Sequence, residues 1–406
     1  MERYERYKDS GVKWIGEIPG HWGMYKLKYL FKLNKNKNIG NKCNTILSLS
    51  YGKIKIKKDL NEGLTPESYE SYQLLSTGDI VIRSTDLQND HTSLRTGLVK
   101  IEGAITSAYI GLKNLDMSLC DSRFYHYFLH DWDITKAIYN QGKGLRQSLN
   151  WDDIKNMLIP VLDISEQTAI ANYLDSTTAK IDEAIAQQQK MIDLLNERKQ
   201  IIINNAVTKG LNPDAPMKDS GVEWIGKIPE HWEVRKLKHI AKLKSGDTIS
   251  SDSFTEDGFP VYGGNGFRGY TNRFTNDGEY VLIGRQGALC GNVNYATGKF
   301  FASEHAVVVY PYDHENVAWL GEVIRASNLN QYSQSAAQPG LAVSVIENIA
   351  YPYPPEKERT AIAEYLAQQM NAINAALHNI ERQISLLQER KQIIINDVVT
   401  GKVKVS

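Results

Sequence analysis

The chain has 406 residues, 42% of them apolar, which is enough to bury the cores of roughly two to four domains. No apolar stretch approaches the roughly 20 residues of a membrane span, and the polar start does not resemble a signal peptide, so we expect a cytoplasmic protein. Three isolated cysteines, Cys43, Cys120 and Cys290, give neither a disulfide framework nor a CxxC metal pair. The 47 basic residues balance 47 acidic ones, and this zero net charge by itself argues against a nucleic-acid binder.

The opening segment of the chain occurs twice. Lys8–Trp22 returns as Lys218–Trp232 with twelve of fifteen positions identical, and the octapeptide ERKQIIIN closes both copies at Glu197–Asn204 and Glu389–Asn396. Two copies of about 200 residues are too few and too long for a solenoid. Because the stretches inside these frames differ, we expect one scaffold with internal pseudo-twofold symmetry that presents two different recognition surfaces. Gly and Pro punctuate the start of each copy, which predicts an extended anchor that docks each lobe onto the scaffold.

The charge distribution reverses the impression that the zero net charge gives. Met24–Lys58 contains no Asp or Glu but ten lysines, among them Lys26 and Lys28. The second copy has a similar cluster, with Arg235, Lys236, Lys238, Lys242 and Lys244 before the next acidic residue, Asp247. One such cluster could be a solvated charged face. Two clusters at equivalent places favour contact with a polyanion.

The variable stretch of each copy reads as mixed α/β. Short apolar runs predict strands at Gly78–Arg83, Tyr280–Arg285 and Ala306–Tyr310, and Gly263–Gly266 predicts a tight turn.

Each copy ends in a segment with helix-forming composition. In the first copy it extends from about Glu166 to Val207 without Gly or Pro. A heptad spacing places Leu174, Ile181, Gln188, Leu195 and Ile202 on one stripe, and Leu366, Ile373, Ile380, Leu387 and Ile394 on the other. Such a stripe needs a partner, and the other helix is the obvious candidate. Roughly forty residues make a rod of about 60 Å. Gly210–Pro216 ends the first helix and predicts a hinge between the copies.

Catalytic signatures are missing from the sequence. Gly263–Gly266 lacks the Lys-Ser/Thr of a phosphate loop, and neither an adenine-methyltransferase signature nor a nuclease metal motif occurs. His126 and His130 have a spacing that can bind zinc, but without a third ligand nearby we expect packing or surface roles. The pair Glu304–His305 has no nucleophile motif around it, so a structural role is favoured there too.

These features together resemble the specificity subunit of type I restriction-modification enzymes. The repeated DSGVxWIGxIPxHW looks like that family's hallmark, as do Tyr262–Gly266, Ile283–Gly287 and the helix entries Glu166–Ile170 and Glu358–Ile362. Arg359 replaces Gln167 at the second helix entry, which we expect to matter little. The first variable region lacks the Tyr-Gly-Gly-Asn-Gly and Ile-Gly-Arg-x-Gly motifs of the second, so the two regions should recognise different sequences.

The resemblance implies an α+β fold in which two mixed α/β target recognition domains are joined by two long antiparallel coiled-coil helices. We expect a first recognition domain with its docking segment over 1–163, a first spacer helix over 164–210, a second recognition domain over 211–355 and a second spacer helix over 356–406. It also implies a non-catalytic subunit that reads a bipartite double-stranded DNA target. Two modification subunits and the restriction subunits would supply S-adenosylmethionine, ATP and Mg²⁺ chemistry, leaving no cofactor or metal in this chain.

We expect side chains in loops and at strand ends to contact the edges of bases, and side chains in the lysine clusters to contact phosphates. In the first copy they are Lys26, Lys28, Arg83, Ser84, Thr85, Lys143, Arg146 and Gln147; in the second they are Lys236, Lys238, Asn265, Arg268, Arg285, Gln286 and Gln338. The alternative is a coiled-coil assembly scaffold that binds proteins without DNA specificity. Salt-sensitive binding to random duplex would discriminate between the two.

Overall fold

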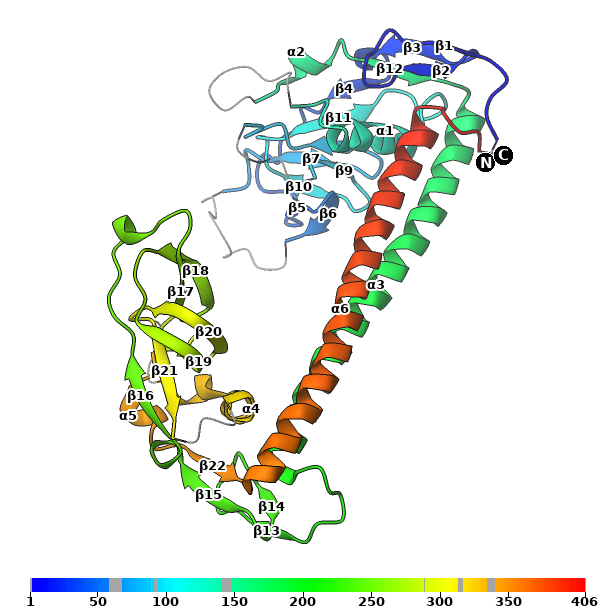
Figure 1. Ribbon diagram of the computed structural model, residues 1–406. Coiled ribbons are helices and arrows are strands. Elements are labelled where there is room, and N and C mark those ends of the chain that lie inside the picture. Colours follow the sequence, from blue (N-terminus) through cyan, green and yellow to red (C-terminus); the bar gives the residue numbers. More distant parts are fainter. Residues whose placement is uncertain are drawn as a thin grey trace. The chain divides into compact units, whose positions relative to one another are not determined.

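The computed structural model describes residues 2–57, 68–88, 90, 94–139, 148–287, 289–312, 317–333 and 340–405. The chain divides into two compact units, with Met1–Gln188 and Arg382–Ser406 in unit 1 and Gln189–Glu381 in unit 2. Two long helices, α3 (Ile164–Lys209) and α6 (Glu356–Val399), each contribute residues to both units (Figure 1). The fold combines helices and strands, as the sequence predicts.

Unit 1 is built on a four-stranded antiparallel sheet in its described part. The strand order is β4 (Phe31–Leu33), β11 (Ile110–Asn114), β8 (Ile80–Ile82) and β9 (Thr96–Leu98). Two-stranded ladders surround it: β1 (Tyr7–Asp9) with β2 (Glu17–Pro19), β3 (Gly23–Lys26) with β12 (Leu158–Val161), β5 (Leu47–Ser50) with β6 (Lys53–Ile56), and β7 (Gln73–Leu75) with β10 (Gly103–Ile105). A short 3-10 turn, η1 (Leu27–Tyr29), follows β3.

The central strand β8 is apolar at every position because both of its faces are buried. Ile80 and Ile82 enter the main core of unit 1, whereas Val81 belongs to a smaller cluster with Leu47 and Leu75. Successive side chains of a strand point to opposite faces, so a sheet covered on both sides needs apolar residues at every position. The predicted strand at Gly78–Arg83 is confirmed in its central part.

Two helices besides α3 complete unit 1, α1 (Ser122–Ile134) and the single turn α2 (Trp151–Ile154). Asp121 begins α1 by accepting a hydrogen bond from the backbone N–H of Arg123 at 2.9 Å, a typical N-cap. Phe124, Phe128 and Trp132 recur at every fourth position and are fully buried, so α1 presents one apolar face to the core.

Unit 2 contains a six-stranded sheet in its described part, with the order β16 (Ala241–Ser245), β21 (Ala306–Pro311), β19 (Asn276–Gly284), β20 (Val293–Ala302), β17 (Phe259–Gly263) and β18 (Gly266–Thr271). All pairings are antiparallel except that of β17 with β20. Beside it lie the ladders β13 (Met217–Asp219) with β14 (Lys227–Pro229) and β15 (Glu233–Lys236) with β22 (Ala350–Tyr353). The strand predicted at Tyr280–Arg285 coincides with the end of β19 except for Arg285, which follows the strand, and the one predicted at Ala306–Tyr310 lies within β21.

Short helical segments complete unit 2: η2 (Leu237–His239), η3 (Ser251–Ser253), α4 (Val317–Ala326), η5 (Leu329–Tyr332) and α5 (Val343–Ile346). Its main core combines the sheet with α4 and with the long helices, through residues such as Val281, Trp319, Val207 and Leu366. As in unit 1, one strand serves two clusters, because Leu282 of β19 faces a separate cluster with Phe300.

The long helices pair within each unit in opposite directions. In unit 1 the beginning of α3 packs with the end of α6, through Leu174 and Val398 in one core and an ion pair of 2.5 Å between Asp182 and Lys391. In unit 2 the end of α3 meets the beginning of α6, and Lys199 donates to Asn374 at 3.3 Å. All ten residues of the predicted heptad stripes are buried or half-buried. None of the helices in the described ranges combines the length and apolarity that crossing a membrane requires.

Candidate nucleic-acid interface

Each repeated docking segment holds the start of one long helix. In unit 1, Glu166 in the first turn of α3 accepts hydrogen bonds from Trp22 Nε1 at 3.2 Å and Tyr4 at 2.7 Å, and its other oxygen lies 2.9 Å from His21 Nε2. In unit 2, Glu358 of α6 accepts from Trp232 Nε1 at 2.9 Å and lies 2.6 Å from His231 Nε2. The expected docking role of these segments is confirmed, although the expected extended anchor is a short hairpin: Tyr7–Asp9 pairs with Glu17–Pro19, and the part around Trp14 forms the turn between them.

The same segments also hold the end of the opposite helix. A Cβ on Gly401, just past the end of α6, would lie 2.3 Å from the ring of Pro19, and one on Gly210, past α3, would lie 3.0 Å from Trp232. Both glycines also have a left-handed backbone, with φ of 73° and 74°. Glycine is therefore required twice over where each long helix ends against the other copy's docking segment.

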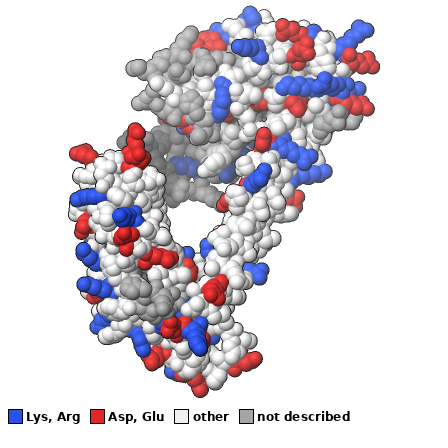
Figure 2. Space-filling view, in the orientation of Figure 1, with Lys and Arg blue, Asp and Glu red and all other residues white. Residues whose placement is uncertain are grey.

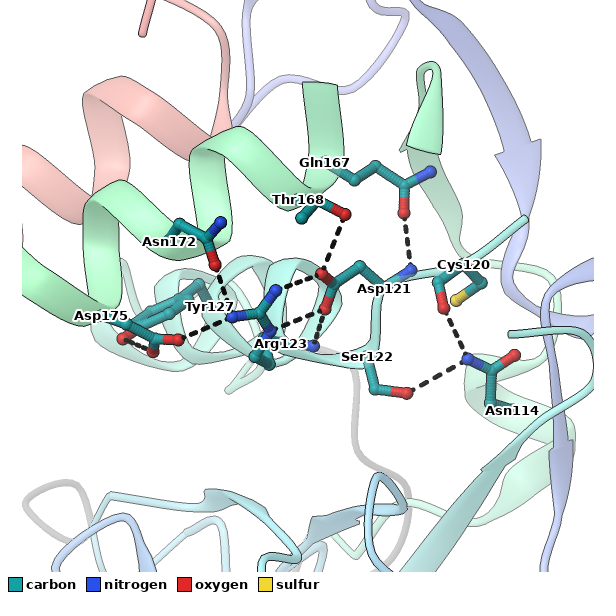
Figure 3. A network of polar contacts seen from close by, with 10 residues as sticks. All are labelled: Asn114, Cys120, Asp121, Ser122, Arg123, Tyr127, Gln167, Thr168, Asn172 and Asp175. Carbon is teal, nitrogen blue, oxygen red and sulfur yellow. Dashed lines mark hydrogen bonds and ion pairs between the residues drawn. The ribbon is translucent and has the colours of Figure 1, made fainter. Parts of the chain in front are cut away.

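A polar network ties the recognition lobe of unit 1 to α3 (Figure 3). The Arg123 guanidinium pairs with Asp121 at 2.7 Å and with Asp175 of α3 at 3.1 Å, and it donates to Asn172 at 2.8 Å. Gln167 accepts from the backbone N–H of Asp121 at 2.9 Å. Because these contacts join the start of α1 to two turns of α3, the network fixes the lobe on the helix.

Arg359 plays a corresponding part in unit 2, contrary to the expectation that its replacement of Gln167 matters little. Its side chain is 4% exposed, and the guanidinium lies over the rings of Tyr353, at 4.4 Å, and Trp319, at 5.6 Å. A planar cation between aromatic faces is a favourable packing arrangement. The two helix entries are thus both buried against their lobes, with different chemistry.

The sequence-predicted contacts of unit 1 do not form one exposed set. Arg83 is half-buried, with its guanidinium 3.4 Å from Asp90. Thr85 is half-buried, and its carbonyl accepts from the fully buried Arg95 at 2.8 Å. Ser84 is only 2% exposed, which disfavours it as a direct DNA contact because its hydroxyl does not reach the surface. Lys143, Arg146 and Gln147 lie outside the described residues.

Unit 2 brings three predicted contacts together. Asn265, Arg268 and Gln286 are exposed and line one cavity of about 580 Å³, which we call the Asn265 cavity. Its described lining is Gly264, Asn265, Phe267, Arg268, Gln286, Gly287, Leu289 and His305. Arg285 lies next to it, half-buried, with Nη1 donating to Ser245 at 3.3 Å. Gln338 lies outside the described residues.

The glycine-rich motifs of the sequence explain how this cavity forms. Gly263–Gly266 makes the predicted tight turn between β17 and β18, and it meets the loop that follows β19. A Cβ on Gly284 would lie 2.2 Å from the carbonyl oxygen of Gly264, so only glycine at position 284 lets the two loops approach this closely. The loops also expose apolar surface, with Phe267 54% and Leu289 46% accessible. Sequence reasoning missed Phe267, because no motif distinguishes it, and it assigned His305 only a structural role.

The four predicted lysines lie elsewhere, on the Lys-Leu-Lys segment that follows each docking segment and that we include in the repeated frame. Lys26 and Lys236 end β3 and β15, Lys28 and Lys238 lie in the following 3-10 turns, and all four are exposed. Figure 2 shows basic side chains along the edge of unit 2 where Figure 1 labels β15 and β16, with acidic ones nearby. Within unit 2, β15 pairs with β22 and lies outside the six-stranded sheet that carries the β17–β18 turn. Neither Lys236 nor Lys238 is among the described residues that line the Asn265 cavity.

The histidines on α1 have a packing role, as expected. Their rings stack with centroids 6.0 Å apart, and His130 Nδ1 lies 3.3 Å from the Thr96 hydroxyl. Burial, together with the neighbouring His130, lowers the pKa of His126 to about 3, and burial lowers the pKa of His130 to about 4. In the described part of the chain, no cluster of His, Cys, Asp and Glu has the geometry of a metal site. Cys120 and Cys290 are buried, Cys43 is half-buried, and all three thiols are free.

Comparison with known proteins agrees with this architecture. Residues 229–386 match the family model of the type I restriction modification DNA specificity domain. The EcoprrI type I restriction enzyme specificity subunit of Escherichia coli is 38% identical over 153 residues, which is 36% of this chain and 38% of that protein. The putative MjaX specificity subunit of Methanocaldococcus jannaschii is 26% identical over 98% of both chains.

Solved structures share the fold. A chain from a study of complex assembly and conformational transition in a type I restriction-modification system superposes with a TM-score of 0.72 at 15% identity, covering 95% of this chain and 99% of that one. The HsdS subunit from Thermoanaerobacter tengcongensis superposes with a TM-score of 0.50 at 16% identity, over 95% and 98% of the two chains.

Proposed function

We propose that this chain, which belongs to the type I restriction-modification specificity subunits, recognises a bipartite sequence in double-stranded DNA. Each unit would bind one half of the target. The observation that carries the proposal is the Asn265 cavity, where Asn265, Arg268 and Gln286 converge on exposed loops. Amide and guanidinium groups are the side chains that pair with base edges in the major groove.

The division into domains follows from the repeat. We propose recognition domains over 1–163 and 211–355, each with its docking segment, and spacer helices over 164–210 and 356–406. Each docking segment binds the start of its own helix and the end of the other, which supports an internal pseudo-twofold relation. Two half-sites separated by about one helical turn would match such symmetry.

The long helices would set the gap between the half-sites and dock two modification subunits. The exposed faces of α3 and α6 leave room for partners, since along their middle parts the covered residues are the heptad stripes and positions beside them such as Ile185, Ile192 and Ile384. Methylation and cleavage would belong to the modification and restriction subunits, which hold S-adenosylmethionine, ATP and Mg²⁺. Purified chain supplied with these cofactors should neither methylate nor cut DNA, and either activity would contradict a non-catalytic role.

A selection experiment tests the proposed function. The full chain is incubated with a library of random duplexes at increasing salt, and bound duplexes are sequenced. We expect two enriched half-sites with a fixed gap, and affinity that falls steeply with salt as counterions are released. A protein-binding scaffold would enrich no sequence, and that outcome would reject the proposal.

A further inference from the structure

The side-chain amide of Gln286 is held by a relay of two residues on the neighbouring loop. His305 Nδ1 lies 2.9 Å from Gln286 Oε1, and the other ring nitrogen lies 3.1 Å from Glu304 Oε1. An amide oxygen and a carboxylate oxygen both accept, so the imidazole makes both contacts in its protonated form, in which Nδ1–H donates to Gln286 and Nε2–H donates to Glu304. The imidazole thus bridges the Glu304 carboxylate to the Gln286 amide oxygen. It fixes the orientation of this amide, with the oxygen toward His305.

The backbone around this relay is fixed as well. Arg285 N donates to the carbonyl of His305 at 2.9 Å, and Gln286 forms a β-bridge with Gly340. A Cβ on Gly264 would lie 3.1 Å from the His305 carbonyl and 3.4 Å from that of Gln286, so the β17–β18 turn packs directly on both. Gln286 therefore has a fixed backbone and a fixed amide, while its side chain stays exposed at the Asn265 cavity.

An amide fixed in this way has the groups that an adenine requires. Glutamine pairs with adenine in the major groove by accepting from N6 and donating to N7. A carbonyl oxygen has two lone pairs, so the bond from His305 leaves one for N6, and both amide hydrogens stay available for N7. A free glutamine side chain would lose rotamer entropy on binding, and the relay removes part of this cost in advance.

We propose that Gln286 reads one adenine of the half-site bound by unit 2, and that His305, held by Glu304, is the positioning residue that orients its amide. This inference rests on the proposed function and names a specificity determinant within it. It also assigns a role to the pair Glu304–His305, for which the sequence suggested only structure. Phe267, exposed in the lining of the same cavity, supplies apolar surface of the kind that contacts a thymine methyl.

The test is selection from a random duplex library with the full chain and with its Gln286→Ala, His305→Ala and His305→Gln variants. The matched control is His239→Ala, at an exposed histidine of η2. Gln286→Ala should lower the preference for adenine at one position by about 5- to 150-fold and leave the other positions unchanged. His305→Ala should lower it at the same position by about three- to tenfold. His305→Gln, which can still donate to the amide oxygen, should restore part of it, and His239→Ala should change nothing.

The outcomes separate this inference from the function on which it rests. If the unmodified chain enriches no motif, the proposed function fails. If it enriches a motif that Gln286→Ala leaves intact, or alters at a position other than adenine, the reading by Gln286 is wrong and the function stands. If His305→Ala weakens every position equally and lowers the melting temperature, His305 only supports the loop, and the positioning role is overturned.

Discussion

Trp22 and Glu166 are joined by a hydrogen bond of 3.2 Å from the indole Nε1 to a carboxylate oxygen, across 144 positions of the chain. Trp232 and Glu358 repeat this bond at 2.9 Å in unit 2. Both indoles are fully buried, so each needs an acceptor inside the protein. The most strongly repeated part of the sequence thus serves to attach a lobe to a helix, and the residues that differ between the copies remain free for recognition.

Removing the acceptor should therefore loosen one unit selectively. We expect Glu358→Ala to lower the free energy of unfolding of unit 2 by about 1–3 kcal/mol, because the buried Trp232 N–H loses its partner. Glu364→Ala, at an exposed site on the same helix, is the control. Urea denaturation with a probe in each unit measures the effect, and an unchanged midpoint for unit 2 would contradict the docking role.

A second prediction concerns acid. The pKa of His126 is lowered to about 3 and that of His130 to about 4, mainly by burial, whereas the unfolded value is 6.5. A depressed histidine pKa means that the unfolded chain binds protons first, so stability is present above pH 6.5 and is lost as pH falls toward the folded values. At pH 5 the loss should be about 2 kcal/mol for each histidine.

Asp131 opposes this trend. Burial raises its pKa from 3.8 to about 6, although its carboxylate accepts from Asn396 at 2.8 Å. A raised carboxyl pKa stabilises the fold as pH falls from about 6 toward 3.8. Between pH 6 and 5 this gain is at most about 1.4 kcal/mol, so the two histidines should dominate. Melting temperatures at pH 7 and 5 check this, and a His126→Gln/His130→Gln variant should lose most of the pH dependence.

The sequence predicted the parts of the fold that periodicity and repetition encode. The heptad stripe ending at Ile202 and the paired docking segments follow from local patterns, and α3 has nearly the expected bounds. The second helix was expected to reach residue 406, but α6 ends at Val399, because Gly401 adopts a left-handed backbone that terminates it. The burial of Ser84 and the stacking of Arg359 depend on residues far away in the chain, which no local pattern reveals. The Asn265 cavity was predicted in part, since glycine spacing marks its loops but nothing in the sequence places His305 beside Gln286.

A third prediction concerns the helices. Inserting seven residues, one heptad, into both helices near Gln188 and Ile380 should preserve the stripe and lengthen each helix by about 10 Å. The gap between the half-sites should then grow by about three base pairs. Inserting three residues at the same places breaks the heptad phase and should instead lower stability. Selected duplexes with an unchanged gap in the heptad variant would show that the helices do not set the spacing.

The last prediction separates two kinds of DNA contact. Arg285 lies beside the Asn265 cavity, where a guanidinium can make a bidentate contact with guanine, so Arg285→Ala should relax one position of one half-site at a cost of about 1–3 kcal/mol. Arg285→Lys keeps the charge but not the planar fork and should relax the same position. Lys236, exposed at the end of β15, should contact phosphate.

Lys236→Ala should therefore weaken all duplexes alike and reduce the slope of log affinity against log salt by about one. Lys357→Ala, an exposed lysine outside the acid-free clusters, is its control. Binding of each variant to selected and scrambled duplexes across a salt series measures both effects. Equal losses on both duplexes for Arg285→Ala would remove that residue from base recognition. An unchanged salt slope for Lys236→Ala would place the phosphate contacts elsewhere, away from the repeated frame to which this lysine belongs.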